Sequence, residues 1–404
     1  MEKIETRCAI SGGGPAGIML GYLLARAGID VVVLEKWPDF FRDFRGDTIH
    51  PSTMEVLKEL GLLEKFVLLP HNKTRQMVGR LADRDVVMAD FGTLKVAAPY
   101  IAFIPQWDFL NFMTREASVY PNFHIMMASE VSELVEENGK IVGLKAKNEK
   151  GEVEIRAELV VGADGRHSTV REKAKLTVIN TDASIDVLWF RIPRVEDGND
   201  QSYNIMQDGK MLVMLNRADY WQCADVIKKG KFEDIKAAGF AAFKASIGAL
   251  DPRLAQGVQS LSDWEDVKFL GVTVDHLETW HQPGLLCIGD AAHAMSPAGG
   301  VGINLAIQDA VGAANILIPA FRAGIPADDD NARIQSRREF PARMTQRMQI
   351  NLHKRGIIPF VSNPAHRTKL PFIVWLVSKL PFLGRIPARI VGMGFRPERV
   401  EVKW

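Results

Sequence analysis

The sequence predicts an α/β protein in which a parallel sheet, built from both ends of the chain, carries an inserted mixed or antiparallel sheet. Three observations support this prediction. An apolar strand, a glycine cluster and a helix-like stretch follow one another over residues 8–27. Alternating polar and apolar residues, typical of strands with one buried face, recur over 182–275. A short apolar strand then returns at 285–288, followed by a long helical pattern.

Length and composition exclude several classes of protein. The chain has 404 residues, more than one hydrophobic core usually serves, so we expect two domains or one elaborated domain. Its net charge of +1 offers no electrostatic field that would attract nucleic acid. Cys8, Cys223 and Cys287 are far apart in sequence, which fits neither a metal site nor a disulfide framework. We therefore expect no metal, no nucleic-acid partner and a reducing, cytoplasmic setting.

The sequence shows no targeting or membrane-spanning signal. Residues 1–7 lack the apolar core of a secretory signal and lead straight into a strand. The apolar segment 371–378 is too short to span a bilayer and is followed by Lys379 and Pro381. We therefore expect no transmembrane segment.

The remaining elements can be placed in order along the chain. Residues 31–34 are wholly apolar, as expected of a strand buried on both faces of a parallel sheet. Further elements are expected at 76–98 (hairpin), 105–119 (helix), 124–161 (strand, hairpin and strand), 232–256 (helical), 302–322 (helix) and 333–354 (basic, Met-rich helix).

These elements divide into a discontinuous domain and an insertion. A Rossmann-like domain takes residues 1–75, 99–181 and 276–350. Residues 76–98 and 182–275 form the inserted domain, and 351–404 form a helical, apolar tail.

The glycines at the start of the chain are spaced as a dinucleotide fingerprint. Gly12 permits a tight turn after the strand, Gly14 lets a pyrophosphate approach the backbone, and Gly17 lets the following helix pack on the sheet. The helix N-terminus offers N–H groups and positive partial charge to phosphates. Glu35 ends the second strand, where it can accept hydrogen bonds from ribose hydroxyls. The alternative is a glycine-rich turn without a ligand.

Two downstream segments repeat the pattern of an apolar strand that ends in glycine and aspartate. They are residues 160–171 (VVGADGRHSTVR) and 286–304 (LCIGDAAHAMSPAGGVGIN). Asp164 and Asp290 should therefore emerge at the carboxyl edge of the sheet, where ligands bind in open α/β folds. The alternative for both aspartates is helix capping. The glycines before residue 304 leave a bare backbone, suited to an anion or a polar ring edge.

In this order and spacing, the three segments resemble the class A flavoprotein monooxygenases, the aromatic-hydroxylase group. The resemblance covers nearly the whole chain. It implies noncovalently bound FAD, NADH or NADPH as co-substrate, and a substrate domain whose sheet lies over the flavin.

The resemblance also implies roles for individual residues. Asp290 would hold the ribityl chain, and Pro297 would lie against the flavin. Arg45 would close over the adenosine and phosphates, Asp164 would contact FAD or the NAD(P)H pyrophosphate, and Gln106 would contact the FAD phosphates or ribityl chain. The family's usual glutamine before the last glycine is Val301 here, which puts a side-chain contact at that position in doubt. The expected FAD contacts are Gly12, Gly14, Pro15, Ala16, Gly17, Glu35, Lys36, Arg45, Gln106, Asp164, Asp290, Pro297, Gly300, Val301, Gly302, Ile303 and Asn304.

Residues of the inserted domain are candidates for substrate contact. The period of a strand puts Trp189 and Arg191 on one face and Phe190 on the other. The first face could floor a substrate cavity, or it could be ordinary sheet core. We assign no catalytic residue, because His50 and His293 fit buried structural histidines better than proton-transfer bases.

The function implied by the resemblance is monooxygenation. NAD(P)H would reduce FAD, and O2 would form a C4a-hydroperoxyflavin that hydroxylates or epoxidises an apolar, aromatic or polyketide-like molecule. The same fold also serves FAD-dependent dehydrogenases or reductases, and flavin halogenases. A halogenase is disfavoured because its two signature tryptophans are Leu188 and Phe190 here. A flavin-binding module without turnover, contact with a membrane through the apolar tail, and a homodimer remain open.

Overall fold

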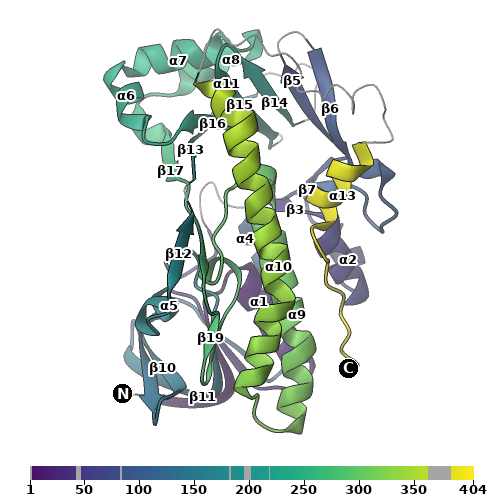
Figure 1. Cartoon of the computed structure of the whole chain (residues 1–404), viewed down its shortest axis with the longest axis vertical. Helices are drawn as coiled ribbons and strands as arrows, with labels where there is room; N and C mark the ends of the chain where they lie inside the picture. Colours follow the sequence, from purple (N-terminus) through teal and green to yellow (C-terminus); the bar gives the residue numbers. More distant parts are fainter. Residues whose placement is uncertain are drawn as a thin grey trace.

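The structure is a computed structural model that describes residues 2–41, 47–81, 84–181, 183–194, 202–217, 219–362 and 384–404. Figure 1 shows an elongated molecule with one sheet at its lower end and a second sheet at its upper end. The long helix α10 (Asp328–Leu352) runs between these two ends.

The lower sheet has the parallel centre that the sequence predicts. Five neighbouring strands run parallel in the order β20-β11-β1-β2-β8. β19 pairs antiparallel with β20, and the hairpin of β9 and β10 extends β11. The strands are β1 (Glu2–Ser11), β2 (Val31–Leu34), β8 (Phe123–Met126), β9 (Glu130–Glu137), β10 (Lys140–Asn148), β11 (Gly151–Gly162), β19 (His281–Gln282) and β20 (Leu285–Cys287).

The carboxyl ends of four parallel strands are aligned. Ser11 of β1 pairs with Leu34 of β2 and with Gly162 of β11, and Gly162 pairs with Cys287 of β20. The residues that come after these four positions therefore leave the sheet along one edge, which is where ligands bind in this class of sheet.

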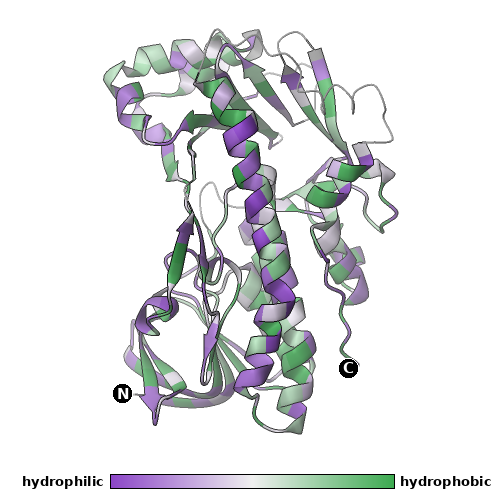
Figure 2. Ribbon diagram, viewed as in Figure 1, coloured by the Kyte–Doolittle hydropathy of each residue, from purple (hydrophilic) through white to green (hydrophobic). Residues whose placement is uncertain are grey.

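Apolar helices cover the parallel sheet. All four residues of β2 are buried, as expected of a strand with helices on both faces. α1 (Pro15–Arg26) packs against α9 (Gly302–Ala323) and α4 (Gln106–Ala117). Figure 2 shows α9 apolar along most of its length and α10 rich in polar residues. The stretch Ala298–Ala323 is long and apolar enough to cross a membrane, but 89% of its most apolar window is buried, so it serves as a core helix here.

The upper sheet has seven strands in the order β17-β13-β16-β15-β14-β5-β6. It is mixed rather than wholly antiparallel, because β14 pairs parallel with β5. Three short helices pack on one of its faces, and their side chains share a core with alternate residues of β13. The elements are β5 (Gln76–Leu81), β6 (Arg84–Asp90), β13 (Ile185–Pro193), β14 (Tyr203–Gln207), β15 (Lys210–Asn216), β16 (Tyr220–Lys228), β17 (Lys268–Gly271), α6 (Phe232–Ala237), α7 (Phe240–Gly248) and α8 (Pro252–Gly257).

Smaller elements connect the two ends. β12 and β18 form a two-stranded ribbon, and β3, β7 and β4 form a three-stranded sheet. α13 packs against α2, β6 and the turn η1. These elements are β3 (Thr48–Ile49), β4 (Asn72–Thr74), β7 (Ile101–Phe103), β12 (Val178–Thr181), β18 (Val274–Leu277), α2 (Pro51–Glu59), α3 (Leu63–Phe66), α5 (Thr169–Lys173), α11 (Ile358–Val361), α13 (Arg385–Met393) and the turns η1 (Phe91–Thr93), η2 (Val258–Ser260), η3 (Trp264–Asp266) and η6 (His353–Ile357).

The last long helix begins earlier than its pattern indicates. The sequence predicts a helix over 333–354, whereas α10 begins at Asp328. Asp330 explains the early start, because its carboxylate accepts a hydrogen bond from the Ala327 N–H at 3.0 Å. The negative charges of three aspartates in the first turn also interact favourably with the helix dipole and stabilise this end of the helix. The two-sheet α/β fold class agrees with the prediction, while the domain boundaries themselves stay predictions.

Candidate active site

The glycine fingerprint forms a tight turn between β1 and α1. Gly12 has a φ of +107°, and a Cβ there would lie 2.4 Å from the Ala163 carbonyl oxygen. A Cβ at Gly17 would lie 1.9 Å from the Gly12 carbonyl oxygen, so the helix approaches the turn only because residue 17 is glycine. A Cβ at Gly14, by contrast, would meet no atom within 4 Å. The Gly14 backbone therefore faces open space, which fits a pyrophosphate at the N-terminus of α1.

Glu35 lies directly beside this turn. Its Oε2 accepts a hydrogen bond from the Gly13 N–H at 3.0 Å, and its Oε1 accepts one from the Trp37 N–H at 3.2 Å. The neighbouring Lys36 places its ammonium 5.3 Å from the Trp37 ring centre. The backbone bonds orient the Glu35 carboxylate at the carboxyl edge of the sheet. Its contact with an adenosine ribose stays a prediction.

Asp164 follows β11 and caps a helix. Its Oδ1 accepts a hydrogen bond from the Ser168 hydroxyl at 2.5 Å, and its Oδ2 accepts one from the Val170 N–H at 3.1 Å. Burial raises the pKa of this carboxyl, and these hydrogen bonds oppose the rise. Both oxygens therefore serve the start of α5, which is the alternative that the sequence left open.

Asp290 is in a different environment, although the local sequence pattern is the same. It lies in the turn η4 (Gly289–Ala291), directly after β20, and 29% of its side chain is exposed. The guanidinium of Arg166 lies 3.6 Å from its Oδ2. A partly exposed carboxylate at the carboxyl edge fits an acceptor for hydroxyl groups of a bound ligand.

The glycines from 299 to 302 form a second close turn. Gly299 and Gly300 have φ values of +80° and +63°, in the turn η5 (Ala298–Gly300). A Cβ at Gly300 would lie 2.5 Å from the Thr48 hydroxyl, which donates a hydrogen bond to the Gly300 carbonyl. Pro297 directly precedes this turn, and Val301 connects it to α9, whose first residues are Gly302 and Ile303. This segment thus offers a helix N-terminus.

Asn304 uses its side chain within the protein. Its Oδ1 accepts hydrogen bonds from the His50 N–H and the Thr53 hydroxyl, each at 2.8 Å. Its amide group donates to the Thr48 carbonyl at 3.1 Å. The side chain therefore holds β3 and α2 against the turn of residues 299–302, and only the backbone of this segment is left for the predicted ring contact.

Gln106 lies beside an ion pair that involves Asp47. Arg45 lies outside the described residues. Gln106 is the first residue of α4, and its N–H donates to the Asp47 carboxylate at 3.4 Å. Asp47 in turn pairs with Arg217 from the end of the upper sheet. Burial raises the pKa of Asp47 and lowers that of Arg217.

The predicted alternation along β13 is present in the structure. Phe190 is fully buried and meets Phe243 of α7, with ring centres 5.6 Å apart. Trp189 lies on the opposite face and packs against the core that includes Ile350 and Ile357. Arg191 is exposed, and its guanidinium lies 5.2 Å from the Tyr220 ring centre. Substrate contact by Trp189 and Arg191 stays a prediction.

The histidines are held by neighbours, which argues against a role as catalytic bases. The ring Nδ1 of His50 lies 2.8 Å from the Val391 carbonyl, and burial lowers its pKa to about 4. The ring Nε2 of His293 lies 2.6 Å from the Asp309 carboxylate, and the side chain is 1% exposed.

Sequence reasoning missed two buried ion pairs, Asp47–Arg217 and Asp309–Arg338. Asp309 and Arg338 are 0% and 1% exposed, and their side chains meet at 2.9 Å. A signal for Asp309 existed, because it is the single acidic residue within the apolar helix α9, and a buried carboxylate requires a partner. Its partner could not be inferred from the sequence.

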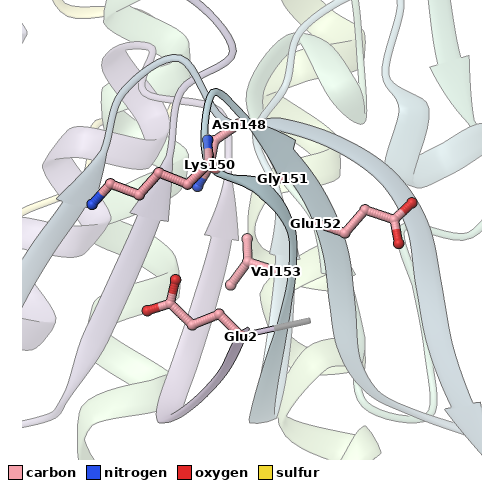
Figure 3. Close-up of a pocket in the computed structure, with 6 residues that line it drawn as sticks. All are labelled: Glu2, Asn148, Lys150, Gly151, Glu152 and Val153. Atoms are coloured by element: carbon pink, nitrogen blue, oxygen red, sulfur yellow. Dashed lines mark hydrogen bonds between the residues drawn. The ribbon is translucent and has the colours of Figure 1, made fainter.

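One cavity lies away from the predicted contacts, and a second is lined by two of them. A surface pocket of about 330 Å³ opens at the amino ends of β1 and β11. Figure 3 shows its lining residues, Glu2, Asn148, Lys150, Gly151, Glu152 and Val153. A cavity of about 30 Å³ behind Val301 and Asn304 is too small for an organic substrate. Among the described residues, no group of three or more His, Cys, Asp or Glu side chains could hold a metal ion.

Comparison with known proteins identifies the family. Residues 5–347 match the family model described as an FAD binding domain. The chain belongs to this family. The resemblance to class A flavoprotein monooxygenases is therefore confirmed, and the protein is an enzyme of the FAD-dependent monooxygenase kind.

Individual relatives agree with this assignment. The chain is 31% identical over 328 residues to the 6-methylpretetramide 4-monooxygenase of Streptomyces rimosus, which covers 80% of this chain and 77% of that protein. Among solved structures, the OxyS anhydrotetracycline hydroxylase of Streptomyces rimosus has a TM-score of 0.75 and 22% identity, over 96% of this chain and 76% of that chain. A flavin-dependent brominase, Bmp2, also has a TM-score of 0.75, with 16% identity, over 96% of this chain and 93% of that chain. At these identities the two structures show the shared fold alone.

Proposed function

We propose that this protein is a single-component monooxygenase that uses NAD(P)H and O2 to hydroxylate or epoxidise an apolar aromatic or polyketide-like molecule. One observation carries the proposal. The fingerprint turn, Glu35 and Asp290 follow strand ends that are aligned along one edge of the parallel sheet, in a chain whose family binds FAD.

The residues at this edge suit the parts of FAD. The open backbone at Gly14 fits the pyrophosphate, and the Glu35 carboxylate would accept hydrogen bonds from the adenosine ribose. Asp290 would accept hydrogen bonds from the ribityl chain. The N-terminus of α9 would face the pyrimidine edge of the ring and stabilise negative charge there.

Bound FAD would supply the redox chemistry, namely hydride acceptance from NAD(P)H and activation of O2. The chain's own contribution is to orient the ring and to exclude water. No second dinucleotide fingerprint follows a strand elsewhere in the sequence, since Gly392 and Gly394 lack both the third glycine and the strand. We infer that the nicotinamide binds transiently against the bound FAD.

The substrate class follows from the upper sheet and from the relatives. One face of β13 carries Trp189, half-buried against Ile350 and Ile357, and the exposed Arg191, so that an aromatic ring and a cation share this face. Such a surface suits a flat aromatic molecule that bears polar groups. Because a relative acts on 6-methylpretetramide, we propose polycyclic, polyketide-like aromatics as the first compounds to test.

Halogenation is not favoured, although a brominase shares the fold. The two positions that carry tryptophans in halogenases are Leu188 and Phe190. Both are fully buried in the core beneath the helices of the upper sheet. They therefore lie on the face of β13 opposite to Trp189.

The first experiment is a test of cofactor and coupling. The purified protein should be yellow, and acid precipitation should release FAD into the supernatant. NADH and NADPH oxidation is then measured against a panel of phenols and polycyclic aromatics, with hydrogen peroxide and hydroxylated product quantified. Product that matches NAD(P)H consumed supports the proposal. Substrate-dependent oxidation that transfers electrons without oxygen in the product would instead support the reductase alternative.

A further inference from the structure

A chain of buried charged groups links the C-terminal segment to the turn that carries Asp290. Glu398 of that segment is 5% exposed in its side chain and accepts a hydrogen bond from Arg338 of α10 at 3.3 Å. Arg338, 1% exposed, donates to Asp309 of α9 at 2.9 Å. Two consecutive helices and the C-terminal segment are thus joined by side chains that are almost fully buried.

Asp309 is the last of these buried charged groups, and it contacts the turn that carries Asp290. Its Oδ2 accepts a hydrogen bond from the Gly289 N–H at 3.1 Å and lies 2.6 Å from the Nε2 of His293. Gly289 has a φ of +60° and is the residue directly before Asp290. One carboxylate therefore holds both ends of the short stretch from Gly289 to His293.

The surroundings are built to keep this carboxylate charged. Burial alone would raise the pKa of Asp309, but His293 and Arg338 outweigh that effect and the pKa is lowered. A Cβ at Gly312 would lie 2.8 Å from the Cδ of Arg338, so glycine at 312 leaves room for the arginine to reach across α9. A buried carboxylate that keeps its charge forms strong hydrogen bonds to backbone N–H groups.

We propose that Asp309 is a positioning residue for Asp290, and that Glu398 supports it through Arg338, so that the C-terminal segment takes part in FAD binding. The inference rests on the proposed place of FAD beside Asp290. If the Gly289 N–H lost its acceptor, the turn that carries Asp290 would shift. A shift of about an ångström would weaken the proposed hydrogen bonds between Asp290 and FAD.

A double-mutant cycle on the full-length apoprotein tests this inference. FAD dissociation constants are measured by fluorescence titration for Asp290→Ala, Asp309→Asn and the double variant. We expect each single change to weaken FAD binding about tenfold, as for loss of a charge-assisted hydrogen bond. If Asp309 acts through Asp290, the second change should cost less than about twofold once the first is made. Additive losses would overturn the inference, because they would show a structural effect that does not pass through Asp290.

The proposed role of Glu398 can be tested against a matched control, Glu401. Glu398 and Glu401 both pair with Arg337, but Glu401 is 59% exposed, whereas the buried Glu398 also pairs with Arg338. We expect Glu398→Gln to weaken FAD binding about threefold or more, and Glu401→Gln to leave it unchanged. Equal effects of the two changes would overturn the role of the C-terminal segment.

Two outcomes separate this inference from the proposed function. If Asp290→Ala binds FAD as tightly as the wild type, then the place of FAD is wrong and the inference falls with it. If Asp290→Ala weakens binding while Asp309→Asn and Glu398→Gln do not, only the inference is wrong. Should Asp309→Asn fail to fold, the cycle of Glu398→Gln with Asp290→Ala gives the same decision.

Discussion

Replacement of Gly14 by alanine should weaken FAD binding and leave the stability of the apoprotein almost unchanged. Gly14 has a φ of −74° and a ψ of −176°, an extended conformation that any residue adopts. The new methyl group meets no protein atom within 4 Å. Loss of unfolded-state freedom stabilises the folded chain and a poorer helix cap destabilises it, so the net change should stay within about 1 kcal/mol.

The same methyl group would occupy the space in which the pyrophosphate should lie. Hydrogen bonds to charged groups contribute about 1.5–3 kcal/mol each, so loss of one corresponds to FAD binding weaker by about tenfold to a hundredfold. Gly12→Ala is the matched contrast. Its φ of +107° and the Ala163 oxygen at 2.4 Å make the folded state itself strained. We expect that change to cost the apoprotein about 2–6 kcal/mol.

Two measurements check this pair of predictions. Denaturant unfolding of each apoprotein gives the free energy of unfolding, and fluorescence titration gives the FAD dissociation constant. The Gly14→Ala protein should bind FAD more weakly while its free energy of unfolding stays close to that of the wild type. The Gly12→Ala apoprotein should have a lower free energy of unfolding than the wild type. A Gly14→Ala protein that binds FAD like the wild type would refute the idea that the phosphates rest on this backbone.

Three further predictions concern single side chains. Glu35→Ala should weaken FAD binding about tenfold or more and keep the fold, measured by the same titration and by circular dichroism; unchanged affinity would argue against an adenosine site at Glu35. Burial lowers the pKa of His50 from 6.5 to about 4, so the unfolded chain binds the proton more readily and stability falls as the pH drops through that range, by about 3 kcal/mol in all. His50→Leu should have a flatter profile of unfolding free energy against pH, and equal slopes would contradict this. Asp290→Ala, saturated with FAD, should slow anaerobic flavin reduction by NAD(P)H in single turnover, whereas Asp164→Ala should mainly lower apoprotein stability by about 1 kcal/mol; wild-type reduction kinetics for Asp290→Ala would count against the flavin placement.

Local rules were sufficient for the parts of the molecule that depend on neighbouring residues. The run from β1 through Gly14 and α1 to Glu35 follows from hydrophobic patterning and glycine geometry alone, and the structure shows each element in place. The predicted start of α10 was wrong because a capping carboxylate, Asp330, extends the helix beyond its hydrophobic pattern.

Long-range pairs could not be predicted from one sequence. Asp47 and Arg217 are separated by 170 residues and meet only because the residue before β3 lies against the end of β15 in the upper sheet. Each alone resembles an ordinary surface charge, and nothing in its neighbourhood indicates the partner. The sequence can show that a charge lies in an apolar stretch, as at Asp309, and so that a partner is required. Which residue supplies it depends on the packing of helices.

The two aspartates that share one local pattern show where such reasoning stops. Asp164 and Asp290 each come after a parallel strand and a glycine, so the pattern places both at the carboxyl edge of the sheet. The segments after the two aspartates are different. After Asp164 a helix is capped at Ser168, close enough for its free N–H and hydroxyl groups to engage both carboxylate oxygens. After Asp290 the next long helix begins only at Gly302, and the carboxylate stays partly exposed beside a cation. The strand pattern therefore predicts the position of such an aspartate, and the distance to the next helix N-terminus decides whether its carboxylate caps that helix.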